Sequence, residues 1–177
     1  MRHIPNLISA VRILLIAPIA VALARHQLSV AMGLFGLAAL SDAADGFLAK
    51  RFGWQSELGA VLDPLADKLL LSTVLVTLSV LNLVPPWLTA SAVARDVIIV
   101  LGAAIYRQMF GVLDVRPSLA SKLNTACEAA FILAVVGAVE FSWPPRWVVV
   151  SLGASMFATV AVSGIDYVLI YCRRARS

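Results

Sequence analysis

Four of the ten acidic residues in this chain form two closely spaced pairs, Asp42 with Asp45 and Asp63 with Asp67. Residues three or four positions apart share one face of a helix, so each pair would present its carboxylates together. Four carboxylates brought together would repel one another unless protons or cations neutralised them. Oxygen donors with no His or Cys nearby favour Mg²⁺ or Mn²⁺, and Ca²⁺ is also open. Two such ions can stabilise the attacking and leaving oxygens of a phosphoryl displacement.

The two pairs are separated by a short polar stretch, residues 51–57. A connection this short predicts that the flanking helices are antiparallel neighbours, which would bring the aspartates together. Gly46 and Gly59 flank the stretch, and a glycine lets a ligand or a second backbone approach closely. Packing of helices through small residues explains these glycines equally well.

The composition indicates that a lipid bilayer surrounds the chain. Hydrophobic residues make up 61% of its 177 residues and charged residues 14%, and the mean hydropathy is +0.93. Soluble domains average roughly 45–50% apolar and about 25% charged residues. The net charge of +4 would suggest nucleic acid in a soluble protein. Here it fits the positive-inside rule and contact with anionic lipid, so no nucleic-acid partner is expected.

Apolar segments separated by polar or proline-rich turns predict an all-α integral membrane protein. At about 20 residues per span, six spans account for most of the chain and indicate a single domain over residues 1–177. Nothing alternates as a barrel strand would, so every segment is predicted to be a helix. The predicted helices cover residues 6–24, 28–49, 57–83, 88–106, 120–139 and 146–171.

The distribution of basic residues predicts the orientation of these helices. With six spans, only Arg25 and Arg146 lie on one side. The other side carries nine basic residues, namely Arg2, Lys50, Arg51, Arg107, Arg116, Lys122, Arg173, Arg174 and Arg176. Both termini are therefore expected in the cytoplasm. The compact chain, with no transit peptide evident, favours a bacterial inner membrane over a mitochondrial one.

The aspartates belong to a longer pattern that resembles a known family motif. The sequence Asp42-Ala-Ala-Asp45-Gly46-Phe-Leu-Ala49-Lys50, eight further residues, and Gly59-Ala-Val-Leu-Asp63-Pro-Leu-Ala-Asp67 resembles the CDP-alcohol phosphotransferase motif. That motif reads D-x-x-D-G-x-x-A-R, eight residues, G-x-x-x-D-x-x-x-D. The one departure is Lys50, which stands where the family has Arg. Lysine keeps the positive charge but loses the planar fork that contacts phosphate bidentately.

The resemblance implies a fold, a reaction and a set of roles. The fold is six transmembrane helices, usually homodimeric, with a polar cavity facing the cytoplasm. In the reaction a CDP-linked donor loses CMP, and its phosphoalkyl group passes to an acceptor hydroxyl. Asp42, Asp45, Asp63 and Asp67 would hold two Mg²⁺ or Mn²⁺ ions, and Asp67 would also be the general base. The donor would be surrounded by a larger set, namely Asn6, Ser9, Gly46, Ala49, Lys50, Ser56 and Gly59.

Shorter patterns concern the acceptor. Ala94-Arg95-Asp96-Val97 and Ser121-Lys122-Leu123-Asn124-Thr125 resemble stretches of the cardiolipin synthases in this family. The prediction is therefore transfer from CDP-diacylglycerol to phosphatidylglycerol, with glycerol 3-phosphate, as in the phosphatidylglycerophosphate synthases, as the alternative acceptor. Arg95, Lys122 and Asn124 are predicted to contact the acceptor.

Several alternatives stay open from the sequence alone. Arg95 and Asp96 could instead form an internal ion pair that fixes helix packing. Arg12 could reach the membrane interface or point into the cavity. A small cation or proton transporter would also carry carboxylates in a helical bundle, but it has no need of Gly46, Gly59 and the eight-residue spacing.

Overall fold

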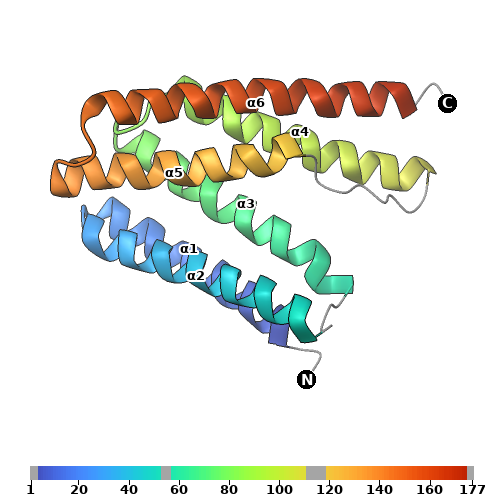
Figure 1. The fold of residues 1–177 in the computed structure, drawn as a ribbon, viewed down its shortest axis with the longest axis horizontal. Coiled ribbons are helices and arrows are strands. Elements are labelled where there is room, and N and C mark those ends of the chain that lie inside the picture. The colour runs from blue at the N-terminus through green and yellow to red at the C-terminus, as the bar shows by residue number, and fades with distance from the viewer. Residues whose placement is uncertain (1–3, 53–56, 111–118, 175–177) are drawn as a thin grey trace. The chain divides into compact units, whose positions relative to one another are not determined.

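The computed structural model describes the backbone of residues 4–52, 57–110 and 119–174, and the side chains of residues 11–41, 65–102 and 120–166. These parts contain six helices and no strand, which confirms the predicted all-α class. The helices, coloured in chain order in Figure 1, are α1 (Ile4–Ala24), α2 (Leu28–Phe52), α3 (Glu57–Val80), α4 (Pro86–Phe110), α5 (Leu119–Phe141) and α6 (Arg146–Arg174). Each predicted helix is present, and the bounds differ from the predicted ones by a few residues.

Two of the helices contain stretches long and apolar enough to cross a membrane, counting only the residues that the structure describes. They are Ala120–Phe141 in α5 and Arg146–Asp166 in α6. Shorter apolar stretches, Val11–Ala24 and Leu28–Ser41, lie in α1 and α2. The six-span topology and the cytoplasmic termini therefore stay predictions.

The chain divides into two compact units, Met1–Leu83 and Val84–Ser177. The prediction of one domain over the whole chain stays a prediction. In the first unit, α2 and α3 each pack against α1, so α1 is their common partner. The core of this unit includes Ile19, Leu23, Leu75 and Leu78, which are almost completely buried. The close contacts of side chains this large add up to a substantial dispersion attraction between these helices.

In the second unit, α6 packs against both α4 and α5. Figure 1 shows α5 and α6 side by side, joined by a short turn. The core includes Phe131 and Ile132 of α5 and Met156 and Val160 of α6. At the edge of the unit, the ring of Trp87 on α4 meets Phe157 on α6 edge to face, with the centroids 5.4 Å apart. Such a geometry adds to the attraction between two aromatic rings.

Short turns end α1 and α3 in the same way. His26 and Asn82 adopt left-handed backbone conformations, with φ of 55° and 59°. The residue after each donates its backbone N–H to a carbonyl five residues earlier, Gln27 to Ala22 at 2.8 Å and Leu83 to Leu78 at 2.9 Å. These bonds are the signature of a Schellman cap, which satisfies carbonyls at a helix end and reverses the chain. The cap at Asn82 explains why α3 stops at Val80, before the predicted end at residue 83.

Two glycines allow α5 to approach the chain that follows it. A Cβ built at Gly153 on α6 would lie 3.1 Å from the ring of Phe131 on α5. A Cβ at Gly137 would lie 3.0 Å from the backbone oxygen of Trp143, in the turn between the helices. The absence of a side chain at both positions therefore keeps this hairpin tight.

Candidate functional site

The structure places both aspartate pairs on continuous helical backbone. Asp42 and Asp45 lie within α2, and Asp63 and Asp67 lie within α3. The helical backbone between the members of each pair is what sharing one face requires. Of the four side chains, only that of Asp67 is among those described.

Most of the predicted donor-binding residues also lie outside the described side chains. Asn6 and Ser9 belong to the backbone of α1, Gly46, Ala49 and Lys50 to that of α2, and Gly59 to that of α3. Ser56 falls in the stretch 53–56, outside the described residues. Their roles around the donor stay predictions.

Asp67 is held by an arginine from another helix. Arg12 Nη1 on α1 donates a hydrogen bond to Asp67 Oδ1 on α3 at 2.5 Å, between residues 55 positions apart in the chain. The two side chains differ in exposure, at 2% for Arg12 and 33% for Asp67. The guanidinium is therefore buried in the first unit, while part of the carboxylate stays accessible. The Arg12 side chain thus lies inside the first unit, and the cavity of the second sequence-based alternative stays a prediction.

The sequence contains a signal for this pair, because the two residues lie at similar distances from the starts of their helices. Arg12 lies eight residues into α1 and Asp67 ten residues into α3, which corresponds to about 12 Å and about 15 Å along the helices. In the predicted topology both helices begin on the same side of the membrane. A lone arginine and an aspartate at similar depth are natural partners, because an unpaired charge there is costly. Asp63, six residues into α3, is as close in depth as Asp67, so the signal points to this pair of aspartates and the contact itself identifies Asp67.

The Asp67 carboxylate is an oxygen ligand of the kind that a divalent metal ion binds. An ionised carboxylate offers two oxygens with about four lone-pair positions, and Arg12 Nη1 engages Oδ1. Oxygen donors of this kind fit Mg²⁺ or Mn²⁺. Among the described residues no three His, Cys, Asp or Glu side chains come together. The remaining predicted ligands, Asp42, Asp45 and Asp63, lie outside the described side chains, so the metal centre stays a prediction.

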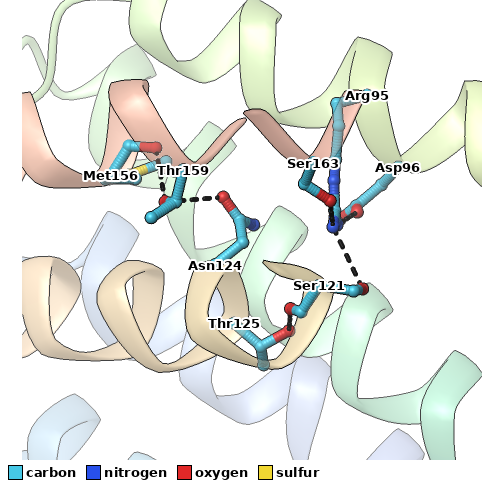
Figure 2. A network of polar contacts seen from close by, with 8 residues as sticks. All are labelled: Arg95, Asp96, Ser121, Asn124, Thr125, Met156, Thr159 and Ser163. Atoms are coloured by element: carbon cyan, nitrogen blue, oxygen red, sulfur yellow. Dashed lines mark hydrogen bonds and ion pairs between the residues drawn. The ribbon is translucent and has the colours of Figure 1, made fainter. Parts of the chain in front are cut away.

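A buried polar network occupies the second unit (Figure 2). Arg95 on α4 donates from Nη1 to Asp96 Oδ1 at 2.5 Å and from Nη2 to Ser121 Oγ on α5 at 3.0 Å. Arg95 Nη2 also donates to Ser163 Oγ on α6. All four residues are buried. One guanidinium thus joins all three helices of the unit, as its five donors in a fixed fork allow.

A second polar contact runs beside this network, as Figure 2 also shows. Thr159 Oγ1 on α6 lies 3.1 Å from Asn124 Oδ1 on α5 and 2.9 Å from the backbone oxygen of Met156. Asn124 is 1% exposed. Interhelical hydrogen bonds of this type help apolar helices to associate in one register.

The three predicted acceptor residues do not share one environment. Arg95 and Asn124 are buried and hydrogen-bonded within the second unit, whereas Lys122 is exposed. The internal ion pair with Asp96, weighed against an acceptor role for Arg95, is present. Arg95 also keeps a buried Nε with no hydrogen-bond partner among the described residues.

Ser121, Thr159 and Ser163 were not predicted to take part in the site. Their signal in the sequence is the spacing of polar residues on otherwise apolar helices. Thr159 and Ser163 are four positions apart and so share a face of α6. Ser121 and Asn124 are three positions apart on α5, and the two faces meet each other.

Comparison with known proteins identifies the family. A family model described as CDP-alcohol phosphatidyltransferase matches residues 2–165. The chain is 31% identical over 180 residues to the cardiolipin synthase (CMP-forming) of Rattus norvegicus, which covers 93% of this chain and 60% of the relative. The human cardiolipin synthase (CMP-forming) matches with the same identity and coverage.

A second kind of relative also matches. The chain is 35% identical over 144 residues to the probable phosphatidylglycerophosphate synthase of Mycobacterium tuberculosis, covering 78% of this chain and 64% of the relative. The chain spans about 60% of the length of the curated cardiolipin synthases it matches.

The family match covers nearly the whole chain and includes both aspartate pairs, as the sequence motif predicted. The chain belongs to the CDP-alcohol phosphatidyltransferase family.

Proposed function

We propose that this protein transfers a phosphatidyl group from CDP-diacylglycerol to the hydroxyl of phosphatidylglycerol, giving cardiolipin and CMP. The observation that carries the proposal is that the aspartate motif lies on helices and that its last aspartate is held by an arginine. Both pairs lie on the helical backbone of α2 and α3, and the last aspartate, Asp67, is partly exposed beside a buried arginine. A carboxylate in this state can accept a proton without first leaving a closed core.

In the proposed reaction the acceptor oxygen forms a bond to the phosphatidyl phosphorus, and the bond between that phosphorus and the CMP oxygen breaks. Asp67 takes the proton of the acceptor hydroxyl, as a general base within hydrogen-bond reach can do. Asp42, Asp45, Asp63 and Asp67 would hold the Mg²⁺ or Mn²⁺ ions, which would offset the negative charge of the pyrophosphate and the leaving group. Lys50 would contribute positive charge near the donor phosphates.

The buried polar network of the second unit contains residues suited to bind the acceptor headgroup. Arg95 is an obligate cation with its Nη groups already oriented by Asp96, Ser121 and Ser163. Asn124 lies on the same face of α5 as Ser121. We propose that Arg95 and Asn124 define the inner end of the acceptor site and that the exposed Lys122 acts at its rim.

Glycerol 3-phosphate is the second candidate acceptor. It is favoured by the 35% identity to the probable phosphatidylglycerophosphate synthase. Both acceptors offer a hydroxyl and a phosphate group, so an arginine near the acceptor suits either. The cardiolipin synthase assignment rests on the stretches around Arg95 and Lys122 and on the relatives that cover 93% of the chain.

The same proposal includes the setting of the reaction. We propose that all six helices cross a bacterial inner membrane, with both termini and the site on the cytoplasmic side, and that the protein is a homodimer. The excess of basic residues on the side of the predicted 2–3 and 4–5 loops supports this orientation.

Purified protein incubated with CDP-diacylglycerol, Mg²⁺ or Mn²⁺ and one acceptor at a time tests the proposal. Cardiolipin and CMP should form with phosphatidylglycerol, and chelation of the metal should stop both. Phosphatidylglycerophosphate without cardiolipin would assign the second acceptor instead. No CMP release with either acceptor would contradict the proposed activity, and metal-dependent ion flux in vesicles would then favour the transporter alternative.

A further inference from the structure

We propose that the turn between α5 and α6 is a lipid-binding surface whose exposed aromatic side chains lie in the headgroup layer of the membrane. This aromatic turn consists of Phe141, Trp143, Arg146 and Trp147. The inference rests on the part of the proposed function that has α5 and α6 crossing the membrane, and not on the reaction or its acceptor. The partner is the phospholipid of the bilayer.

The aromatic side chains of the turn project from the second unit. Trp143 is 72% exposed, Trp147 is 70% exposed and Phe141 is 59% exposed. Rings of this size are costly to leave in water. Exposed apolar groups gathered on one short segment mark a surface that contacts another molecule or a membrane.

The aromatic turn joins the two described stretches that are long and apolar enough to cross a membrane. The first, Ala120–Phe141, ends at the turn, and the second, Arg146–Asp166, begins there. When both stretches span the hydrocarbon core, the residues between them lie at its edge. Tryptophan concentrates at this edge because its ring is apolar while its indole N–H can hydrogen-bond to headgroups and water.

The exposed side of α6 identifies lipid, rather than a second protein, as the partner. Exposed apolar side chains follow Trp147 along the helix, at Val150, Phe157, Val162 and Ile165. They are spread over a broad face and reach from the turn to the far end of the apolar stretch. A surface of this length is what a lipid-facing helix presents, and the aromatic turn is continuous with it.

The charged residues of the hairpin support the same placement. Glu140 and Arg146 flank the turn, and both are exposed. The next charged residue of α6 is Asp166, twenty positions after Arg146. This separation corresponds to about 30 Å of helix, which is the approximate thickness of the hydrocarbon core. At the edge of that core, Arg146 can reach a lipid phosphate while its methylene groups stay against the acyl chains.

Trp87 provides an internal reference for depth. It is exposed like the tryptophans of the turn, but its ring meets Phe157. Phe157 lies eleven residues beyond Arg146, which is about 16 Å along α6. Trp87 should therefore lie deeper in the bilayer than the aromatic turn does.

Depth-dependent quenching of tryptophan fluorescence tests the proposal. The chain has four tryptophans, and three full-length variants keep one each, Trp87, Trp143 or Trp147, with phenylalanine at the other three positions. Each variant is reconstituted into phosphatidylcholine vesicles whose acyl chains are brominated near either the carboxyl end or the methyl end. Trp143 and Trp147 should lose more fluorescence with the carboxyl-end label, and Trp87 should lose more with the methyl-end label.

The outcomes separate this proposal from the membrane setting. Quenching of Trp87 but not of Trp143 and Trp147 would place the turn in water or against protein, and the proposal alone would fail. Stronger quenching of Trp143 and Trp147 by the methyl-end label would place the turn inside the hydrocarbon and would also overturn it. No quenching of any of the three would contradict the crossing of the membrane by α5 and α6 as well.

Single substitutions keep the test decisive if a variant with one tryptophan does not fold. Trp143→Phe and Trp147→Phe, each in the otherwise wild-type chain, should reduce the quenching by the carboxyl-end label relative to wild type. Unchanged quenching in both would overturn the proposal. Release of CMP plays no part in these measurements, so failure of the proposed reaction would leave their result intact.

Discussion

Arg95 on α4 and Ser163 on α6 lie 68 positions apart in the chain and are joined by a hydrogen bond from Nη2 to Oγ. The same nitrogen bonds Ser121 on α5. Ser163 is completely buried, so its hydroxyl has no water to bond if Arg95 is removed. This contact shows how a charge inside an apolar bundle becomes part of its architecture.

Removal of the Ser163 hydroxyl should destabilise the second unit modestly. Ser163→Ala is expected to lower the free energy of unfolding by about 1 kcal/mol, within the range for interhelical hydrogen bonds in membrane proteins. Arg95→Leu should cost about 3–5 kcal/mol, because it takes the cation from beside the buried Asp96. Thermal unfolding in detergent measures both. Ser155→Ala is the control, since that hydroxyl is exposed and bonds Ser151 of its own helix. A loss from Ser155→Ala equal to that from Ser163→Ala would contradict this account of the network.

Neutralisation of Asp67 should separate binding from chemistry. Asp67→Asn keeps the shape of the side chain but removes the base, so turnover should fall by about 10²–10⁴-fold. CDP-diacylglycerol binding should stay measurable by equilibrium binding. Asp166→Asn, at an aspartate of α6 outside the motif, should leave turnover near the wild-type value. Wild-type rates in Asp67→Asn would remove the assignment of Asp67 as the base.

Substitution by alanine should have opposite effects on stability at Gly137 and at Gly33. A Cβ at Gly137 would meet the backbone oxygen of Trp143 at 3.0 Å, whereas one at Gly33 would meet nothing within 4 Å. Gly137→Ala should therefore destabilise the protein, because the backbone of the turn must shift. Gly33→Ala should stabilise it by up to about 1 kcal/mol, the difference in helix propensity between the two residues. Unfolding midpoints of the two variants, compared with wild type, check this; a stabilising Gly137→Ala would show that the turn adjusts freely.

Replacement of His26 by glycine should stabilise the protein. Its φ of 55° costs a residue with a Cβ about 1–2 kcal/mol relative to glycine. His26→Gly should therefore raise the free energy of unfolding by up to about 1 kcal/mol once the added chain entropy is subtracted. Gln27→Gly, next along the same turn, should stabilise nothing, since Gln27 is not among the described residues with positive φ. Chemical denaturation of the two variants measures the difference.

The helices were predictable because their signals are local. Runs of apolar residues broken at Arg25-His26-Gln27 and Pro85-Pro86 define elements without any knowledge of what they pack against. The prediction missed the end of α3 by three residues because it depends on the left-handed conformation of Asn82, and asparagine adopts that conformation only where the turn requires it. The family was also predictable, since the aspartate motif occupies one short stretch of the chain.

The choice of partners was not local, and the tertiary structure decided it. By sequence Arg12 could reach the membrane interface or a cavity, and only the packing of α1 against α3 placed it beside Asp67. Ser163 looked like any small residue of an apolar helix until α4 placed Arg95 against it. The sequence by itself determined which residues could carry charge or metal, because side-chain chemistry belongs to each residue. Only the packing of helices determined which charges meet, because the cost of burying a charge depends on what lies next to it.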